Sequence, residues 1–233
     1  MFQRPHHQRI QCVLESLDYR LLKDHSCYFG GGTAIALSRG EYRESLDLDF
    51  LVSNLDAYRE LRRLVGQPDG LSALFRSDSN QLAQSREVRS DQYGIRTWLA
   101  VGDVQIKFEI VFEARINIET PAVCNAICNV LTLTRLDMAA TKLLANSDRW
   151  ADKGVFGRDV IDLAMLDLSS AELQSALLKA EAAYGPAIRR DLAKAVDRMQ
   201  TLHGWMERCM DKLKIELPKA YLWCQMRRLR IAV

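Results

Sequence analysis

The sequence lacks three kinds of pattern, and each absence narrows the class of protein that it encodes. It has almost no excess of charge, since 32 Lys and Arg stand against 30 Asp and Glu, whereas a dedicated nucleic-acid binder carries a strongly basic surface. None of its six cysteines forms a Cys-x-x-Cys pair, and no cysteine–histidine spacing is that of a zinc site. No apolar run approaches the roughly 20 residues of a membrane-spanning helix.

Signals for export and repetition are also missing. Residues 1–20 contain no apolar core of a secretion signal, and the chain shows no internal repeat or low-complexity segment. We therefore expect a cytoplasmic protein that is not bound to a membrane and whose cysteines are buried free thiols. Cys124 and Cys128 are four residues apart, which predicts that they share a helix face. With 48% hydrophobic residues, the 233-residue chain can form one core or two small domains.

The first half of the chain mixes helical and extended patterns. Apolar residues recur at helical spacing over 10–22, which predicts an opening amphipathic helix. A run of three glycines precedes a short predicted helix over 33–38, and a further glycine closes it. An asparagine caps a predicted helix over 54–65, whereas the polar segment 76–92 is expected to form a long loop.

Residues 45–52 alternate between apolar and polar side chains with the period of a β-strand. Asp47 and Asp49 therefore share one face of this strand. The opposite face carries Leu46, Leu48, Phe50 and Val52. Two further strands, over 95–101 and 104–112, are joined by a Gly-Asp pair that suits a two-residue hairpin turn.

After residue 120 the apolar pattern is helical throughout. Thr120-Pro121 suits a helix start, and Ser169-x-x-Glu172 is a capping box. The predicted helices lie near 134–146, over 158–168, from 170 to 184, from 187 towards 213, and after Pro218. We therefore expect an α+β chain with a mixed α/β domain over 1–119 and an all-helical domain over 120–233, with the active site in the cleft between them.

Two motifs carry the chemistry. Asp47-x-Asp49 places two carboxylates on one strand face, where their repulsion favours a bound cation, although an isolated Asp-x-Asp is more often an acidic strand surface. Gly30-Gly31-Gly32 leads into a helix that starts at Thr33, where free backbone N–H groups suit phosphate, although such a loop alone is more often a plain turn. Their succession within about 20 residues places a phosphate-binding loop beside a metal site.

Glu109 is a candidate third acid. It lies in the second hairpin strand and faces away from the core, as Asp47 and Asp49 do in theirs. If the two strands are neighbours, all three carboxylates converge. The alternative is a surface glutamate paired with Lys107 or another base, and the sequence favours neither interpretation.

At these residues the chain resembles a known family. Residues 29–37 read Phe-Gly-Gly-Gly-Thr-Ala-Ile-Ala-Leu, and residues 42–50 read Tyr-Arg-Glu-Ser-Leu-Asp-Leu-Asp-Phe. Both segments are similar to the AbiEii/AbiGii-type toxins, a branch of the DNA polymerase β-like nucleotidyltransferase superfamily, which show a Gly-Gly-Thr loop and then Arg-x-Ser-x-Asp-φ-Asp-φ. The family's later third acid best matches Glu109.

The resemblance extends into the helical half, to about residue 165. The family has a lysine on a helix, then an arginine, then a basic–acidic pair that opens another helix. Lys142, Arg149 and Arg158-Asp159 resemble these positions, with Asp162 as an alternative to Asp159 for the functional acid. Residues 170–233 match nothing in the family.

The resemblance implies a nucleotidyltransferase-like small mixed sheet with flanking helices, followed by an all-helical bundle. It also implies an enzyme that uses Mg²⁺, with Mn²⁺ as an alternative, to move NMP from an NTP to an acceptor. Members are toxins of toxin–antitoxin or phage-defence pairs, so a cognate antitoxin is an implied partner and tRNA a candidate acceptor. The implied catalytic residues are Asp47, Asp49, Glu109, Lys142 and Asp159, of which the first three bind metal; the implied nucleotide-binding residues are Gly31, Gly32, Thr33, Arg43 and Ser45.

Several of these roles have two versions. Glu109 is either a metal ligand or the base that receives the proton of the attacking hydroxyl. Ser45 contacts phosphate or orients Asp47, and Arg43 pairs with phosphate or supports the strand acids. Lys142 stabilises charge on the phosphates or is a helix-surface lysine, with Asp159 positioning it or the acceptor.

Two other functions compete with a tRNA-modifying toxin. The same site could modify a small molecule, such as an aminoglycoside, or a protein side chain, because a fold and a metal site do not name the acceptor. The other hypothesis is that the protein is a nucleotide-binding module without catalytic activity. A basic rim would favour nucleic acid; the tail Arg227-Arg228-Leu229-Arg230 and the loop 76–92 are the candidate RNA contacts.

Overall fold

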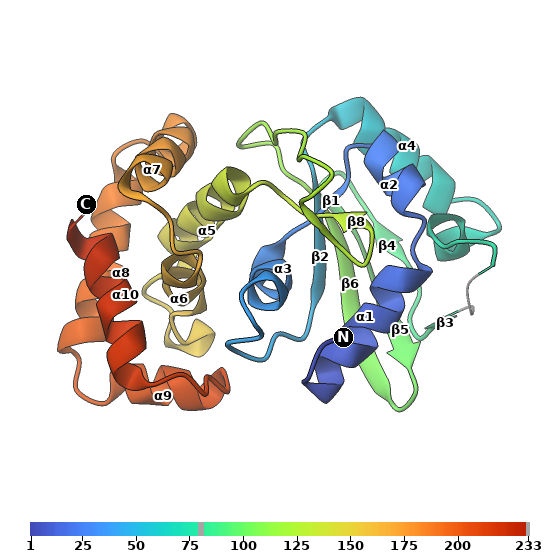
Figure 1. Ribbon diagram of the computed structural model, residues 1–233. Coiled ribbons are helices and arrows are strands. Elements are labelled where there is room, and N and C mark those ends of the chain that lie inside the picture. Colours follow the sequence, from blue (N-terminus) through green and yellow to red (C-terminus); the bar gives the residue numbers. More distant parts are fainter. Residues whose placement is uncertain (79–81, 232–233) are drawn as a thin grey trace. The chain divides into compact units, whose positions relative to one another are not determined.

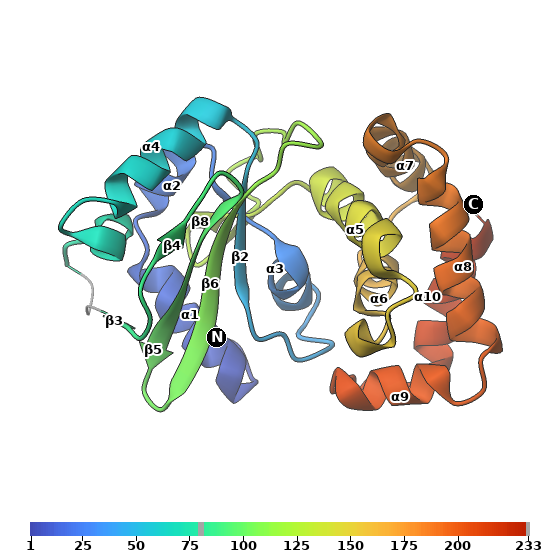
Figure 2. The same cartoon turned by 180° about the vertical axis from the view of Figure 1, so that it is seen from behind.

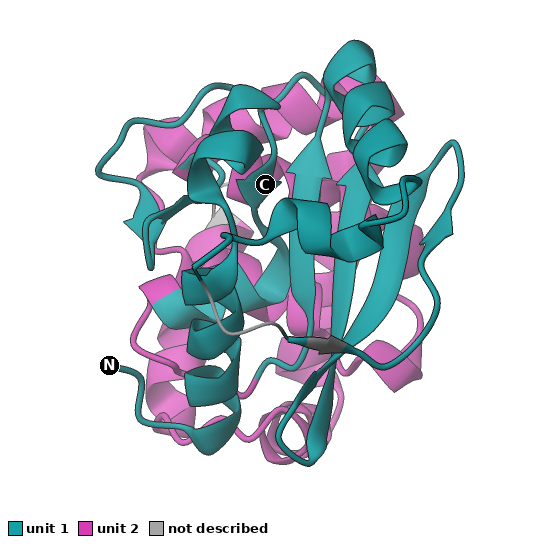
Figure 3. Cartoon of the chain, turned by 90° about the vertical axis from the view of Figure 1, so that its right-hand side faces the viewer, with its two compact units in different colours: residues 1–37, 45–134 teal, residues 38–44, 135–233 magenta. Residues whose placement is uncertain are grey.

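The computed structural model describes residues 1–78 and 82–231, without the side chains of Ala83 and Ile231. The chain divides into two compact units, which Figure 3 shows in different colours. Unit 1 consists of residues 1–37 and 45–134, and unit 2 of residues 38–44 and 135–233. The part of the predicted loop 76–92 that covers residues 79–81 lies outside the described residues.

A mixed sheet forms the centre of unit 1, as the sequence predicted. Its strands lie in the order β1-β2-β6-β5-β3, and β4 pairs with β5. Strands β2 and β6 are parallel, and the other pairs are antiparallel. The strands are β1 (Tyr28–Phe29), β2 (Leu48–Val52), β3 (Ala83–Gln84), β4 (Arg89–Ser90), β5 (Gly94–Val101) and β6 (Val104–Phe112). The predicted hairpin is therefore confirmed as β5–β6, and the predicted loop contains β3 and β4.

Helices cover the sheet on both sides. Figure 1 shows α1, α2 and α4 on one side of the sheet and α3 on the other. The helices are α1 (Pro5–Ser16), α2 (Tyr19–Asp24), α3 (Gly31–Ser38) and α4 (Leu55–Val65), with a 3-10 helix, η1 (Gly70–Leu74). The cap of α4 is as predicted, since the side chain of Asn54 accepts a hydrogen bond from the backbone N–H of Ala57 at 2.9 Å.

The single opening helix predicted over 10–22 is wrong. The chain leaves the helix at Leu17, which forms a bridge with Phe75. Asp18 then caps a second helix, because its side chain accepts hydrogen bonds from the backbone N–H groups of Arg20 and Leu21. The apolar spacing continues across this break, which is why the sequence alone read it as one helix.

The apolar face of the sheet is built on three phenylalanines from neighbouring strands. Phe29, Phe50 and Phe108 are fully buried, with ring centroids 5.4 Å apart in each successive pair. Leu46, predicted to share this face, is instead 52% exposed. The reason is that β2 begins only at Leu48, and His6 contacts the carbonyl oxygen of Leu46 at 3.1 Å.

The last segment of unit 1 differs from the prediction. Residues after Thr120-Pro121 form a small hairpin, β7 (Ala126–Ile127) and β8 (Val130–Leu131), and not a helix. The two residues between these strands have left-handed backbones, with φ of 51° and 66°, which suits a tight hairpin turn. Cys124 and Cys128 therefore do not share a helix face.

The division between the units falls at residue 134, whereas the sequence placed the domain boundary after 119. Segment 120–134 belongs to unit 1 because it is tied to β1. The backbone N–H of Leu133 donates to the carbonyl oxygen of Phe29 at 2.9 Å, and Thr132 forms a parallel bridge with Phe29.

Unit 2 is helical in the part of it that the structure describes. Its helices are α5 (Arg135–Arg149), α6 (Arg158–Met165), α7 (Ser170–Tyr184), α8 (Ala187–Thr201), α9 (Trp205–Lys212) and α10 (Lys219–Ile231), with a 3-10 helix, η2 (Lys153–Val155). The capping box at the start of α7 is confirmed. The long helix predicted towards Leu213 is two helices, because Gly204 takes φ of 70° and starts α9. Within the described residues, no helix has the length and apolarity needed to cross a membrane.

We expect Phe50→Ala to lower the free energy of unfolding of the protein by about 3–5 kcal/mol, since it removes the middle ring of a fully buried row and leaves a cavity. Urea denaturation followed by circular dichroism measures this. Tyr93→Ala is the matched control, because that aromatic side chain is 63% exposed, and its cost should stay below about 1 kcal/mol. Equal losses in both variants would contradict the assignment of the core.

Candidate active site

The predicted site residues fall into two groups, one in each unit. In unit 1, the parallel pairing of β2 with β6 sets Asp49 directly opposite Glu109. Paired residues on neighbouring strands project to the same face of a sheet. The sequence predicted that Glu109 would lie near the two aspartates if their strands were neighbours, and the strands are neighbours. Asp47 lies two residues before Asp49, just ahead of β2.

The glycine loop lies against Asp49. The backbone N–H of Gly30 donates to the carbonyl oxygen of Asp49 at 2.8 Å. Gly31 has φ of 65°, and a Cβ atom added to it would come within 2.8 Å of the Cβ of Asp49 and also meet the carboxylate. Only glycine allows this approach, so the N-terminus of α3 and an acidic side chain share one small space.

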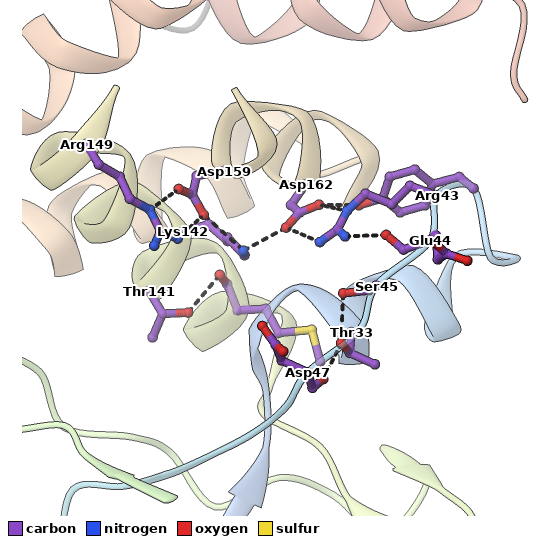
Figure 4. Close-up of polar contacts among 12 residues, drawn as sticks. Thr33, Arg43, Glu44, Ser45, Asp47, Thr141, Lys142, Arg149, Asp159 and Asp162 are labelled. Atoms are coloured by element: carbon purple, nitrogen blue, oxygen red, sulfur yellow. Dashed lines mark hydrogen bonds and ion pairs between the residues drawn. The ribbon is translucent and has the colours of Figure 1, made fainter. Parts of the chain in front are cut away.

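Thr33 and Ser45 brace the segment that carries Asp47. The hydroxyl of Thr33 donates to the backbone carbonyl of Asp47 at 2.5 Å, and its oxygen lies 2.7 Å from that of Ser45 (Figure 4). The backbone N–H of Ser45 in turn donates to Nε2 of the buried His7 at 3.1 Å. Thr33 is 1% exposed, so these hydroxyls hold the backbone before β2 in place. Of the two roles predicted for Ser45, this geometry favours the orientation of Asp47.

Glu109 is held by two cations. Nε of Arg96 donates to one carboxylate oxygen and Nζ of Lys107 to the other, both at 2.5 Å. Burial alone would raise the pKa of Glu109, but the hydrogen bonds and charges of Lys107 and Arg96 outweigh it, so the pKa is lowered. The pairing with Lys107 that the sequence offered as an alternative is therefore present, together with the position opposite Asp49.

The carboxylates of unit 1 meet part of what a divalent metal ion requires. Among the described residues, no three or more His, Cys, Asp and Glu side chains form a group that could hold a metal. Two carboxylates beside a glycine loop nevertheless fit Mg²⁺, which proteins commonly bind through one or two carboxylates plus phosphate oxygens and water. Asp47 and Asp49 would hold it. Glu109 would join only after one of its two cations moves away.

In unit 2, Asp162 is the centre of a buried network. Arg43 grips it with two hydrogen bonds, Nε to Oδ1 at 2.6 Å and Nη2 to Oδ2 at 2.9 Å. The hydroxyl of Tyr42 donates to it at 2.5 Å, and Nζ of Lys142 lies 2.6 Å from it. Asp162 is fully buried. Burial would raise the pKa of Asp162, but the effect of Arg43 and Lys142 is larger and lowers it, so the carboxylate stays charged.

Asp159 is the second carboxylate that contacts Lys142. Nζ of Lys142 lies 3.0 Å from Oδ1 of Asp159, and Arg149 donates to both carboxylate oxygens at 2.7 and 2.9 Å (Figure 4). Burial opposes the charge of Asp159, yet Lys142 and Arg149 together lower its pKa. Lys142 is 5% exposed, so it is not a surface lysine: it is held between two carboxylates, one on each side.

Arg43, predicted to pair with phosphate or to support the strand acids, is a member of the network around Asp162. The side chain is 4% exposed and both ends of its guanidinium are engaged, with Nη1 donating to the carbonyl oxygen of Glu44 at 2.8 Å. Three of its five N–H groups are thus used within the network, and the carboxylate that it supports is Asp162 and not a strand acid. No local pattern predicts this pair, because Arg43 and Asp162 lie far apart in the chain.

Two cations lie on the acidic face of unit 1, the face of β2 and β6 that carries Asp49 and Glu109. Arg96 was not predicted to belong to it, and Lys107 was considered only as a partner of Glu109. A signal for Arg96 existed: counting back from the predicted hairpin turn sets it opposite Glu109, and the observed register agrees. Burial lowers the pKa of Lys107, whereas the negative charges of Asp47 and Asp49 contribute to raising it. The acidic face of unit 1 thus carries its own cations.

Comparison with known proteins places these features in a class, the nucleotidyltransferases. A family model described as "Nucleotidyl transferase AbiEii toxin, Type IV TA system" matches residues 13–225. The chain therefore belongs to the AbiEii nucleotidyltransferase toxin family, as its motifs predicted. The match reaches residue 225, so the expectation that residues 170–233 match nothing in the family was wrong. A comparison with curated proteins gives no match.

Two solved structures are similar to the chain. The Helicobacter pylori protein JHP933 is 15% identical, with a TM-score of 0.50 over 99% of this chain and 94% of that one. A second H. pylori structure, whose assignment as a nucleotidyltransferase is provisional, is 18% identical, with a TM-score of 0.49 over 97% and 93% of the two chains. At such identity, the likeness to JHP933 concerns the fold alone.

Asp162→Ala should lower the free energy of unfolding by about 3–5 kcal/mol, because it leaves Arg43 and Lys142 as buried cations that have lost a partner. Thermal and urea denaturation measure the loss. Asp56→Ala serves as the control, since that carboxylate is 91% exposed and pairs with the exposed Arg59 at 3.2 Å; it should cost less than about 1 kcal/mol. A cost for Asp162→Ala no larger than the control would show that the network does not hold unit 2 together.

Proposed function

We propose that this protein is the toxin of a toxin–antitoxin pair and that it transfers NMP from an NTP to tRNA in a Mg²⁺-dependent reaction. One observation carries the proposal: the glycine loop at the start of α3 lies against Asp49, which is paired in register with Glu109. A phosphate-binding loop and a carboxylate face thus share one space in unit 1. Membership of the AbiEii family supports the toxin role and a cognate antitoxin as partner.

The residues of unit 1 divide the work of holding the nucleotide. The backbone N–H groups of Gly31 and Gly32, at the N-terminus of α3, bind the triphosphate. Asp47 and Asp49 are the metal ligands; the metal, when bound, stabilises negative charge on the attacking and leaving oxygens. Thr33 and Ser45 keep these ligands in position through the backbone of Asp47.

Glu109 is assigned the role of ligand and not of general base. A general base works best when its pKa is near the working pH, whereas the pKa of Glu109 is lowered by Lys107 and Arg96. When the triphosphate arrives, its oxygens compete with Glu109 for these two cations. Lys107 and Arg96 are then free to contact phosphate, and a carboxylate oxygen of Glu109 is free to complete the ligand set.

Lys142 is the proposed cation for the negative charge that develops on the transferred phosphoryl group. Asp159 and Arg149 fix its position in unit 2, and this favours Asp159 as the positioning acid. Asp162, which is fully buried and already contacts Arg43, Tyr42 and Lys142, has the environment of a structural residue. Of the two acids between which the sequence did not choose, we therefore propose Asp159.

The decisive assay incubates the purified protein with Mg²⁺, each labelled NTP in turn, and total tRNA. We expect label to move from one NTP to tRNA, and we expect Asp47→Asn/Asp49→Asn to reduce the rate at least about 10³-fold, since metal binding is removed while the side-chain volume is kept. A thermal melt of the variant confirms that it is folded. Binding of NTP without transfer would send the search to small-molecule or protein acceptors, and full activity of the double variant would refute the proposed metal ligands.

Gly31→Ala tests the close approach of the loop to Asp49. We expect it to abolish NTP binding, because the new Cβ collides with Asp49 and the backbone conformation is unfavourable for alanine. Gly40→Ala is a matched control: Gly40 has φ of 71° but nothing within 4 Å of the added atom, so it carries the backbone strain alone. Equal NTP affinity of the two variants, measured by calorimetry, would mean that the contact with Asp49 plays no part.

A further inference from the structure

Unit 2 contains a row of three cations and three aromatic rings outside the residues discussed so far. It runs from α8 across the loop between α5 and α6 to α9. Its members, in spatial order, are Lys194, Trp150, Arg198, Trp205, Phe156 and Arg208. We call this set the cation–aromatic row. Figures 1 and 2 show α9 beside the loop that joins α5 to α6, where the row is assembled.

Each step of the row is a direct contact. Nζ of Lys194 lies 5.2 Å from the ring centre of Trp150, and Arg198 donates to the backbone carbonyl of Trp150 at 3.1 Å. The guanidinium of Arg198 lies 4.8 Å from the ring centre of Trp205, which stacks on Phe156 at 6.3 Å. Arg208 closes the row, 5.9 Å from the ring of Phe156. Such contacts hold a cation over an aromatic face and leave its N–H groups available at the edges.

The arginines of the row are not neutralised by acids. Within residues 1–78 and 82–231, no carboxylate forms an ion pair with Arg198 or Arg208, whereas Arg228 and Arg230 of the basic tail pair with Asp167 and Asp197. Glu207, next to Arg208 in the chain, forms an ion pair with Lys219. Lys194 has only a long contact, 3.8 Å, with Asp191. The charges of Arg198 and Arg208 are therefore less compensated by acids than those of Arg228 and Arg230 in the tail that the sequence suggested.

The loop that carries the row is strained and tied down. Phe156 and Gly157 both have left-handed backbones, with φ of 51° and 60°, an unusual state for a bulky residue that is common at functional sites. A Cβ on Gly157 would come within 3.0 Å of the sulfur of Met199, so the loop packs closely on α8. Its two ends are joined by the ion pair of Arg149 with Asp159, the pair that holds Lys142.

We propose that the cation–aromatic row binds the acceptor as a single-stranded nucleic acid, with phosphates on Lys194, Arg198 and Arg208. The proposal rests on the function proposed above, whose acceptor it specifies. A single strand, which offers both phosphates and flat bases, matches a surface that presents cations beside the partly buried rings of Trp150 and Phe156. The row adjoins the residues that position Lys142, so a bound strand would lie next to that part of the catalytic machinery in unit 2.

The test measures binding, so that it does not depend on turnover. A fluorescently labelled single-stranded RNA of mixed sequence is titrated with the wild-type protein and with Lys194→Glu/Arg208→Glu at several salt concentrations. We expect the affinity of the variant to fall at least about tenfold. The slope of log K against log salt should drop by about 1.4, because each phosphate contact on a single strand contributes about 0.7.

The matched control is Arg59→Glu/Arg63→Glu on α4, which changes the net charge equally on two exposed arginines of unit 1. It should retain wild-type affinity and slope. Lys194→Gln/Arg208→Gln, which removes the charges without reversing them, should show a smaller loss of the same kind, and thermal melts check that all variants are folded.

Three results would overturn the inference: no RNA binding by the wild type, equal loss in the control, or binding of polyglutamate but not RNA that depends on Lys194 and Arg208. The last would assign the row to an acidic protein partner. The tRNA transfer assay distinguishes the two proposals. Undiminished transfer and RNA affinity in Lys194→Glu/Arg208→Glu would refute the row and leave the proposed function standing, whereas RNA binding that depends on the row without any transfer would do the opposite.

Discussion

The arrangement of the candidate site in unit 1 depends on the parallel pairing of β2 with β6. A strand has only two faces, and the burial of Phe50 and Phe108 on one of them forces Asp49 and Glu109 onto the other. A shift of β2 by one residue in register would bury Asp49 and expose Phe50. The hydrophobic core thus fixes the position of the carboxylates far more strongly than any interaction that the carboxylates make themselves.

Charge is handled differently in the two units. On the acidic face of unit 1, Glu109 is 12% exposed and contacts two cations that are each 36% exposed, so its ion pairs lie where a ligand could compete for them. In unit 2, Asp162 and its partners are almost wholly enclosed. Breaking such a buried pair is costly. The first arrangement suits groups that exchange partners during a reaction, and the second suits a framework that stays as it is.

Much of this could be predicted from the sequence because it is encoded locally. The strand over 48–52, the hairpin turn and the capping box at Ser169 each depend on residues close together in the chain, and all three appear in the structure. The glycine loop and Asp49 were expected to be close, and they are in contact. Even the pairing of Arg96 with Glu109 could have been obtained by counting from the turn.

What escaped prediction depends on contacts between distant segments. No residue near Arg43 in the sequence predicts its ion pair with Asp162, and none near Phe156 predicts its stacking on Trp205. The break after Ser16 depends on Phe75, and the hairpin after residue 120 depends on β1. Apolar spacing describes the face that a segment will bury but not the partner that will cover it. For this reason the sequence predicted one helix where α1 and α2 are separate, and a helix where β7 and β8 form a hairpin.

The path of the chain between the units has a consequence for how this protein can evolve. Residues 38–44 belong to unit 2 although both their neighbours in sequence belong to unit 1. There Arg43 pairs with Asp162, the backbone N–H of Glu44 donates to Leu213 at 3.1 Å, and its side chain pairs with Lys214 at 2.6 Å. A single crossover near residue 134 would therefore join a foreign unit 2 to an inherited piece of the old one. Recombination can exchange the units only in lineages where these few residues already agree, so the halves of this protein are expected to be inherited together.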